Sequence, residues 1–292
     1  MVSSSPVKTL VTGALGQLGS EIRDISKFYP QFDFSFVDVD DLNLTDFERV
    51  SNFISKNDFR VIVNCAAYTA VDAAEDQLEL AMAVNAEAVH GIARICKENA
   101  IRLVHISTDY VFDGESNQPL NEEAETNPLS VYGVSKLKGE QYIQSILDDA
   151  YIIRTAWVYS TFGKNFVKTI DSLARQRPEL GVVADQIGAP TYAHDLAVVI
   201  LEILQQVFSS KKDVPGIYHY TNEGAISWYD LAHFIVRHAN LPCNVKALST
   251  EEYKTKAVRP KFSLLNKRKI KDTFGITVPH WHDSLLKCLE KM

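Results

Sequence analysis

Residues 7–19 of the chain read Val7-Lys8-Thr9-Leu10-Val11-Thr12-Gly13-Ala14-Leu15-Gly16-Gln17-Leu18-Gly19. The first five residues are typical of a β-strand, and a helical pattern begins near Gln17. Glycines spaced three apart permit a tight turn and close backbone approach to a pyrophosphate, whose charge a helix N-terminus favours. Strand-to-helix turns often need glycine for backbone reasons alone. Because this turn is the first strand-to-helix junction of the chain, we favour a dinucleotide site.

Strand and helix patterns alternate through the first half of the chain. Further strands are expected at residues 34–37, 61–63, 103–106 and 151–154, and further helices at 77–99 and 131–147. Strands separated by helices imply βαβ units and a parallel sheet that is covered on both faces. The predicted fold class is therefore α/β, with a Rossmann-type doubly wound parallel sheet.

The pattern becomes less regular after Trp157. Helical patterns near residues 165–177, 194–208 and 228–238 are separated by proline-containing loops. Doubly wound folds bind ligands at the carboxyl edge of the sheet, and we expect a smaller C-terminal substrate-binding region packed over that edge. The sequence thus divides into a dinucleotide-binding domain at 1–157 and a substrate region at 158–292. A segment at about 185–215 is expected to return to the first domain.

The composition is that of an ordinary soluble protein. The 292 residues are 46% hydrophobic and carry a net charge of −7, which argues against a nucleic-acid scaffold. The four cysteines are far apart, so they suggest neither a zinc site nor a disulfide framework, and they fit a reducing compartment. Neither a signal peptide nor a membrane-spanning apolar stretch is recognisable. We expect a cytoplasmic protein with no membrane or nucleic-acid partner.

Tyr132 and Lys136 are four residues apart, so they share one face of a helix. A neighbouring ammonium favours the phenolate and is expected to lower the pKa of the tyrosine. Such a pair can give a proton to a carbonyl oxygen that the hydroxyl of Thr108 orients. The same spacing is common on ordinary amphipathic helices, so its meaning depends on the surrounding motifs.

The second predicted strand ends at Asp38, 19 residues after Gly19. A carboxylate there can accept hydrogen bonds from an adenosine ribose and would repel a 2′-phosphate, which favours NADH over NADPH. A solvated turn aspartate is the alternative. The small residues of the segment 64–69 suit a backbone that lies against a flat cofactor, or tight helix–sheet packing.

These motifs occur in the order found in a known family. The segments that carry the resemblance are the glycine turn, Asn64–Thr69, Ser107–Phe112, Tyr132-x-x-x-Lys136, Arg154–Tyr159, Asn165–Val167, Asp185–Thr191 and Arg259–Pro260. Together they resemble the extended short-chain dehydrogenase/reductases and, within them, the dTDP-4-dehydrorhamnose reductase family. The resemblance extends from the first strand to about Asn266.

The resemblance implies reduction of the C4 keto group of dTDP-4-dehydrorhamnose by NADH or NADPH, the last step of dTDP-L-rhamnose synthesis. Tyr132 would be the proton donor, Lys136 would hold the nicotinamide ribose, and Thr108 would bind the carbonyl oxygen. The matching cofactor contacts are Gly13, Gly16, Gln17, Leu18, Gly19, Asp38, Asn43, Leu44, Ala67, Tyr68, Thr69, Ile106, Tyr132 and Lys136. The matching sugar-nucleotide contacts are Thr108, Asp109, Trp157, Val71 and Asn165.

The chain departs from the family pattern at two places. Asn43-Leu44-Thr45 stands where members commonly have Asp-Ile-Thr near the adenine. Some members form a magnesium-linked homodimer through glutamates, and Glu21 matches one of these, but His194 replaces another. We therefore predict no metal site, while a homodimer stays possible. For Trp157, a core position between the domains is the alternative to a sugar contact.

Other members of the same fold offer competing functions. A dehydratase usually has Thr-Asp-Glu after the fourth strand, but here Tyr110 follows Thr108-Asp109, which favours a simple reductase over a dehydratase or epimerase. A non-catalytic, NADP-binding regulatory subunit of the methionine adenosyltransferase type is a second alternative. The presence of Thr108, Tyr132, Lys136 and Trp157 together favours the enzyme.

Overall fold

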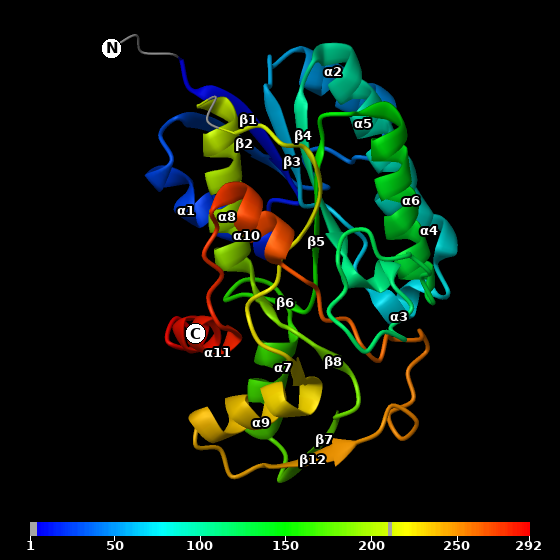
Figure 1. Ribbon diagram of the computed structural model, residues 1–292, viewed down its shortest axis with the longest axis vertical. Coiled ribbons are helices and arrows are strands. Elements are labelled where there is room, and N and C mark those ends of the chain that lie inside the picture. The colour runs from blue at the N-terminus through cyan, green and yellow to red at the C-terminus, as the bar shows by residue number, and fades with distance from the viewer. Residues whose placement is uncertain (1–4, 210–211) are drawn as a thin grey trace.

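A six-stranded parallel sheet forms the centre of the computed structural model, which describes residues 5–209 and 212–292 (Figure 1). Most of the N-terminal segment that was inspected for a signal peptide lies outside these residues. The strands are, in spatial order, β10 (Gly216–His219), β5 (Tyr151–Thr155), β4 (Arg102–Thr108), β3 (Val61–Asn64), β1 (Val7–Thr12) and β2 (Phe32–Val37). Every neighbouring pair runs parallel.

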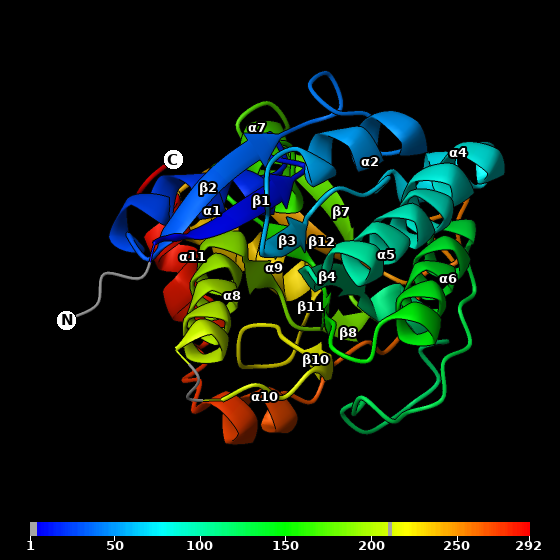
Figure 2. The same ribbon diagram turned by 90° about the horizontal axis from the view of Figure 1, so that it is seen from above.

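Helices cover both faces of this sheet (Figure 2). On one face lie α1 (Gln17–Ile25), α8 (Ala193–Phe208) and α10 (Arg268–Phe274), and on the other lie α2 (Phe47–Ser55), α5 (Ala88–Asn99) and α6 (Val131–Ile146). Successive strand residues alternate between the two apolar cores: Val11 and Val63 belong to the first, Leu10 and Ile62 to the second. Because both faces of the sheet are buried, residues that point to either face are apolar, and the strands are nearly continuous apolar runs.

The long helix predicted at 77–99 has the expected extent but is not regular. It consists of α4 (Leu78–Met82), a π-helical turn (Ala83–Glu87) and α5. The wider turn directs Asn85 toward the segment after β3, where its amide bonds both the N–H and the carbonyl of Tyr68, at 2.8 and 3.0 Å. The same amide donates to the Ser135 hydroxyl at 3.0 Å. A single side chain thus joins this helix to α6 and to the loop after β3.

A smaller lobe lies beyond the carboxyl edge of the sheet and has its own apolar core. Its helices are α7 (Phe166–Ala174), α9 (Trp228–His238) and α11 (Trp281–Leu289). Its strands form the pairs β7 (Glu179–Val183) with β12 (Asn244–Leu248), β8 (Ile187–Gly188) with β11 (Ile226–Ser227), and β6 (Val158–Tyr159) with β9 (Thr191–Tyr192). The remaining elements are α3 (Val71–Ala74) and two single 3₁₀ turns at Ser26–Phe28 and Asp109–Val111.

The predicted fold class is confirmed by this architecture. The sequence prediction missed β10, because four residues after a polar loop carry little periodic signal. In the structure β10 extends the sheet next to β5, and α8 packs against α1. Within the described ranges, no helix is long and apolar enough to cross a membrane.

The close contact between α1 and the preceding turn yields a stability prediction. A methyl group at Gly19 would lie 2.3 Å from the Gly13 carbonyl oxygen and 2.7 Å from Ala14 Cα. Gly19→Ala should therefore lower the free energy of unfolding by about 1–3 kcal/mol, measured by urea denaturation. Ser20→Ala, which loses only a 3.4 Å hydrogen bond to Ala14, is the matched control. An unchanged midpoint for Gly19→Ala would contradict the packing argument.

Candidate active site

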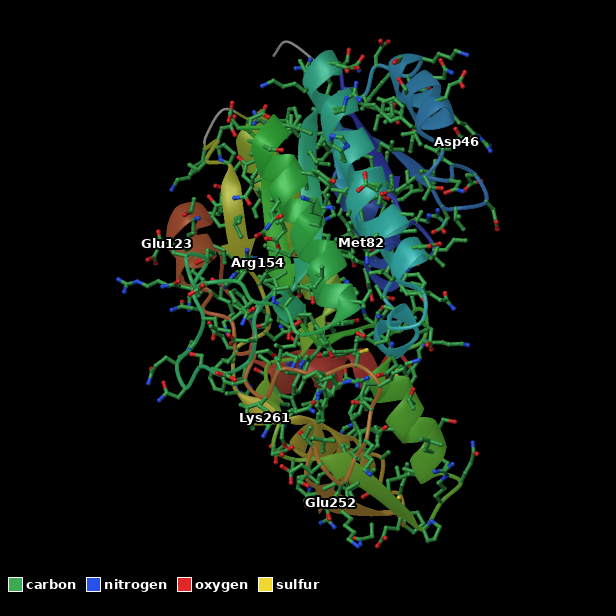
Figure 3. The ribbon with its side chains drawn as sticks, turned by 90° about the vertical axis from the view of Figure 1, so that its right-hand side faces the viewer. Asp46, Met82, Glu123, Arg154, Glu252 and Lys261 are labelled. Carbon is green, nitrogen blue, oxygen red and sulfur yellow. The ribbon has the colours of Figure 1, made fainter. Side chains whose placement is uncertain are left out.

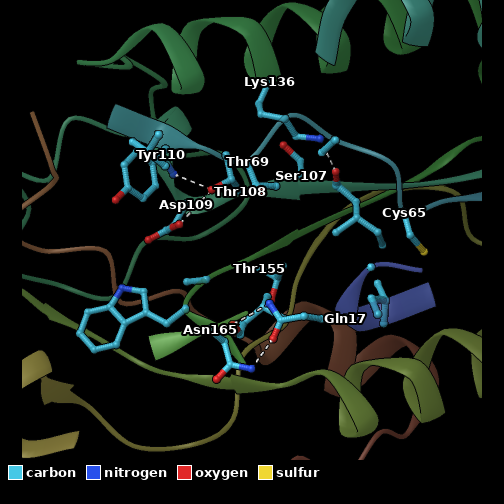
Figure 4. Close-up of a pocket in the computed structure, with 18 of the residues that line it drawn as sticks. Gln17, Cys65, Thr69, Ser107, Thr108, Asp109, Tyr110, Lys136, Thr155 and Asn165 are labelled. Carbon is cyan, nitrogen blue, oxygen red and sulfur yellow. Dashed lines mark hydrogen bonds between the residues drawn. The ribbon is translucent and has the colours of Figure 1, made fainter. Parts of the chain in front are cut away.

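A cavity of about 530 Å³ lies at the carboxyl edge of the sheet, between the two lobes (Figure 4). Residues at the ends of β1, β3, β4 and β5 form its sheet side, and Trp157, Asn165 and Trp228 form its other side. A second cavity of about 310 Å³ adjoins it at Gly16 and Ala67. The position agrees with the ligand site expected for a doubly wound sheet.

The two cavities bring together nearly all residues that the sequence singled out. The first is lined by Gly16, Gln17, Leu18, Ala67, Thr69, Val71, Ile106, Thr108, Asp109, Tyr132, Lys136, Trp157 and Asn165. The second is lined by Gly13, Gly16, Asp38, Asn43, Leu44, Ala67 and Tyr68. Gly19 is the exception, because it lies under the turn and permits close packing of α1 on Gly13.

The glycine turn is shaped for a group that comes close to the backbone. Gly13 has φ +65°, and a Cβ there would lie 2.7 Å from the Ala66 nitrogen. Gly16 is the residue before the first turn of α1, where no side chain caps the helix N–H groups. A pyrophosphate fits this cradle because small residues leave room for it and the helix N-terminus favours its charge.

Asp38 and Asn43 both accept hydrogen bonds from backbone N–H groups. Asp38 accepts from the backbone N–H groups of Leu15 and Val39, at 2.7 and 2.8 Å, and therefore ties the end of β2 to the glycine turn. Asn43 accepts from the N–H of Thr45 at 3.1 Å. The turn role that was the alternative for Asp38 is thus present, and the carboxylate also lines the second cavity.

Tyr132 lies in the first turn of α6, which Ser130 caps by accepting from the Gly133 N–H at 3.2 Å. Its ring meets that of Tyr110 edge to face, with centroids 5.4 Å apart. Burial raises the pKa of Tyr132 to about 12, while the Thr108 hydroxyl acts in the opposite direction. The phenol is therefore protonated at neutral pH and available as a proton donor.

Lys136 lies one turn further along α6 and is only 1% exposed. Its ammonium donates to the Ile106 carbonyl at 2.6 Å and lies 3.3 Å from His105 Nε2. Burial lowers the pKa of Lys136 to about 8, against the opposing effect of the Glu140 charge. The expectation that Lys136 lowers the pKa of Tyr132 is not met in this arrangement, because the ammonium is directed to the sheet and burial of the phenol dominates.

Thr108, the last residue of β4, and Asp109, the first residue of the 3₁₀ turn that follows, lie at the floor of the cavity. The Thr108 hydroxyl donates to Asp109 Oδ1 at 3.0 Å and accepts from the Tyr110 N–H at 3.2 Å (Figure 4). Burial raises the pKa of Asp109 to about 6, although the hydroxyls of Ser263 and Thr108 act in the opposite direction. The cavity floor thus presents a hydroxyl and a nearly buried carboxyl side by side.

Two tryptophans form the wall opposite the sheet. Trp157, at φ +51°, stacks on Trp228 with ring centroids 3.7 Å apart and an angle of 13°. Trp157 is also packed against the core of the smaller lobe, so the core role and the cavity role coincide. Trp228 was not singled out from the sequence, because only the fold brings the start of α9 to Trp157.

Asn165 and Gln17 link the two lobes. Asn165 donates from its amide to the Gln17 side-chain oxygen at 3.0 Å and caps α7 by accepting from the Lys168 N–H. Gln17 in turn donates to the Val158 carbonyl at 3.2 Å. Arg259 donates to both carboxylate oxygens of Asp72, which adjoins Val71. Gln17 and Val71 both line the cavity, so these links hold parts of its wall.

A buried ion pair behind the cavity was also missed. Arg154 on β5 donates to both oxygens of Glu140 on α6, at 2.6–3.2 Å, and Ser107 donates to the same carboxylate. Glu140 and Arg154 are 0% and 3% exposed. Figure 3 places Arg154 beside α6, well inside the molecule compared with Asp46 and Glu252. Glu140 follows Lys136 by one helical turn, a spacing that the sequence already contained.

Glu21 and His194, discussed for a metal site, also meet. Glu21 accepts from the Ser160 hydroxyl at 2.6 Å and lies 3.2 Å from His194 Nδ1. In residues 5–209 and 212–292, no group of three or more potential metal-ligating side chains is found.

A phenol and an ammonium over the carboxyl edge of a Rossmann-type sheet are the arrangement of the short-chain dehydrogenase/reductases, and the chain is an oxidoreductase of that class. The family model described as RmlD substrate binding domain matches residues 7–292, and the chain belongs to that family.

Relatives and solved structures agree with this assignment. The chain is 38% identical over 285 residues to the dTDP-4-dehydrorhamnose reductase of Aggregatibacter actinomycetemcomitans, with 95% of this chain and 97% of the relative covered. The crystal structure of a dTDP-4-dehydrorhamnose reductase from Clostridium acetobutylicum matches with a TM-score of 0.93 at 39% identity, over 98% and 99% of the two chains. That of the Bacillus anthracis enzyme in complex with NADP matches with a TM-score of 0.92 at 34% identity, over 98% and 100%.

The buried ion pair can be tested by removing one partner. Arg154→Met leaves the Glu140 carboxylate buried without its guanidinium, and should lower the free energy of unfolding by about 3–5 kcal/mol in urea denaturation. The double variant Glu140→Gln, Arg154→Met removes the unpaired charge and should recover part of this loss. If the double variant is as unstable as the single one, the loss comes from packing and not from the uncompensated charge.

Proposed function

We propose that the protein reduces the C4 keto group of dTDP-4-dehydrorhamnose to give dTDP-L-rhamnose, with NADH or NADPH as the reductant. The observation that carries this proposal is the position of Tyr132, Lys136 and Thr108 in one cavity, between a glycine cradle and a wall of two tryptophans. The relatives named dTDP-4-dehydrorhamnose reductase support the choice of substrate, and the NADP complex of the Bacillus anthracis enzyme supports the choice of cofactor.

The cofactor, when bound, supplies the hydride, and the chain supplies its orientation and a proton. The glycine turn would hold the pyrophosphate, and Asp38 would bind the adenosine ribose. Lys136 would bind the nicotinamide ribose from the floor of the cavity. Tyr132 would give its phenolic proton to the C4 oxygen of the sugar, because its raised pKa keeps that proton in place until negative charge develops.

The smaller lobe would bind the sugar nucleotide. The stacked Trp157 and Trp228 offer a broad apolar wall of the kind that suits a pyranose ring. Thr108 would donate to the carbonyl oxygen, and Asp109 beside it would accept from a sugar hydroxyl. We assign residues 1–157, with α8 and β10, to cofactor binding and most of 158–292 to the substrate. The free cysteines favour a cytoplasmic enzyme.

The proposal predicts cofactor oxidation that depends on the keto sugar. Purified protein should consume NADH and NADPH, followed by nicotinamide absorbance, only when dTDP-4-dehydrorhamnose is added. NADH should give the higher kcat/KM, because Asp38 disfavours a 2′-phosphate. Binding of cofactor without oxidation would instead favour the regulatory, non-catalytic role, and release of water from the sugar would favour a dehydratase.

Tyr132→Phe removes the proton donor while it keeps the ring. Turnover should fall by about 10² or more, with the cofactor Kd nearly unchanged. The control is Tyr110→Phe, which alters the neighbouring ring of the same cavity and should keep most of the activity. Full activity in Tyr132→Phe would show that another group supplies the proton.

A further inference from the structure

Lys136 is held by a series of hydrogen-bonded side chains near the carboxyl edge of the sheet. The proposed reaction does not use these side chains. His105 Nε2 lies 3.3 Å from the Lys136 nitrogen, and His105 Nδ1 lies 3.1 Å from the Asn64 amide. The nitrogen of that amide faces His105, and its Oδ1 accepts from the Thr12 hydroxyl at 2.7 Å. Thr12, Asn64 and His105 are each at most 1% exposed and come from three adjacent strands, β1, β3 and β4.

The positive charge on Lys136 determines which nitrogen of His105 carries the proton and how the Asn64 amide is oriented. An ammonium can only donate, so Nε2 must accept and a neutral ring must carry its proton on Nδ1. Nδ1–H then requires an acceptor, so the Asn64 amide must be reversed from the orientation in which its Nδ2 faces His105 Nδ1 and its Oδ1 accepts from the Thr12 hydroxyl. Its oxygen then accepts from Nδ1–H, and its NH₂ group faces Thr12. Both orientations of the amide preserve the same distances, because its oxygen and nitrogen are nearly equal in size.

We propose that His105 is a positioning residue for Lys136: its neutral ring accepts a hydrogen bond from the ammonium through Nε2, and Asn64 and Thr12 hold the ring in the Nδ1–H tautomer. This proposal rests on the function proposed for Lys136. The Ile106 carbonyl fixes the ammonium from one side, and His105 fixes it from the other.

The other groups around Lys136 do not replace this acceptor. Glu140, on the same helix, is occupied by Arg154 and Ser107. Burial raises the pKa of the Cys65 thiol to about 12, so it is neutral at physiological pH. Burial and the nearby ammonium both hold the pKa of His105 well below its usual range, which keeps the ring neutral.

The tautomer can be measured without any catalysis. Nitrogen-15 NMR of histidine-labelled protein at pH 6.5, where Lys136 is charged, should show His105 as a neutral ring protonated on Nδ1. Lys136→Met should shift the Nε2 resonance, because the hydrogen bond to it is lost. A charged ring, or a neutral ring protonated on Nε2, would overturn the proposal.

The effect on Lys136 can be measured through pH. A hydrogen bond to the charged form raises the pKa of that form, so His105→Phe should lower the pKa of Lys136 further below about 8. The alkaline limb of the pH profile, where kcat/KM falls as Lys136 loses its proton, should shift to a lower pH by about one unit. Cofactor binding should weaken at pH 8 but not at pH 6.5. His105→Gln places an amide near the Nε2 position and should restore the limb.

His219→Phe is the matched control. His219 on β10 is as buried as His105, its pKa is lowered to about 3, and it lies 3.1 Å from the Leu120 carbonyl, away from Lys136. This variant should lose stability without moving the alkaline limb. If His105→Phe and His219→Phe shift the limb equally, or neither shifts it, His105 does not position Lys136. Absence of keto-sugar reduction in the wild type would refute the proposed function and leave the NMR result standing.

Discussion

The polar side chains beneath the cavity surround the ammonium of Lys136, which is almost wholly removed from water. An unpaired charge in such a place costs several kcal/mol, so the ammonium needs hydrogen-bond acceptors or a counter-charge among its neighbours. The Ile106 carbonyl and His105 are the acceptors, and Glu140 is the nearby negative charge. These groups reduce the free-energy cost of burying the Lys136 charge.

The parallel sheet makes this arrangement possible. Alternate residues of each strand point to opposite faces, and at the carboxyl edge the same alternation carries Asn64 and His105 under α6. Tyr132 and Lys136 lie one turn apart on α6 and make different contacts. The Tyr132 ring packs against Tyr110 in the cavity, while the Lys136 ammonium donates to the Ile106 carbonyl of β4. Burial protects the proton of the first and depresses the pKa of the second, so the phenol keeps its proton over the physiological range.

Local patterns predicted the parts of the fold and site that depend on local sequence. The glycine turn, the first five strands and the pair on α6 could all be recognised, because spacing and strand periodicity act over a few residues. Trp228 could not, because it reaches Trp157 only through the packing of distant segments. The pairing of Arg154 with Glu140 was also not predicted, although both residues lie in predicted elements, because spacing alone does not show which side chains meet between a strand and a helix. The raised pKa of Tyr132 was not predicted, because burial dominates it and sequence spacing contains no information about burial.

The cavity also depends on contacts between lobes that no single motif contains. Asn165 bonds Gln17 in the wall of the cavity, and Arg259 bonds Asp72, the neighbour of the lining residue Val71. Trp157 follows β5 directly but packs with the smaller lobe, and its positive φ turns the chain from one lobe into the other. A sugar-nucleotide that lies against Trp157 therefore lies next to the residues that join the lobes. These few polar links therefore hold the smaller lobe against the glycine turn, while Tyr132 is positioned by α6, which Ser130 caps and Asn85 ties to the loop after β3.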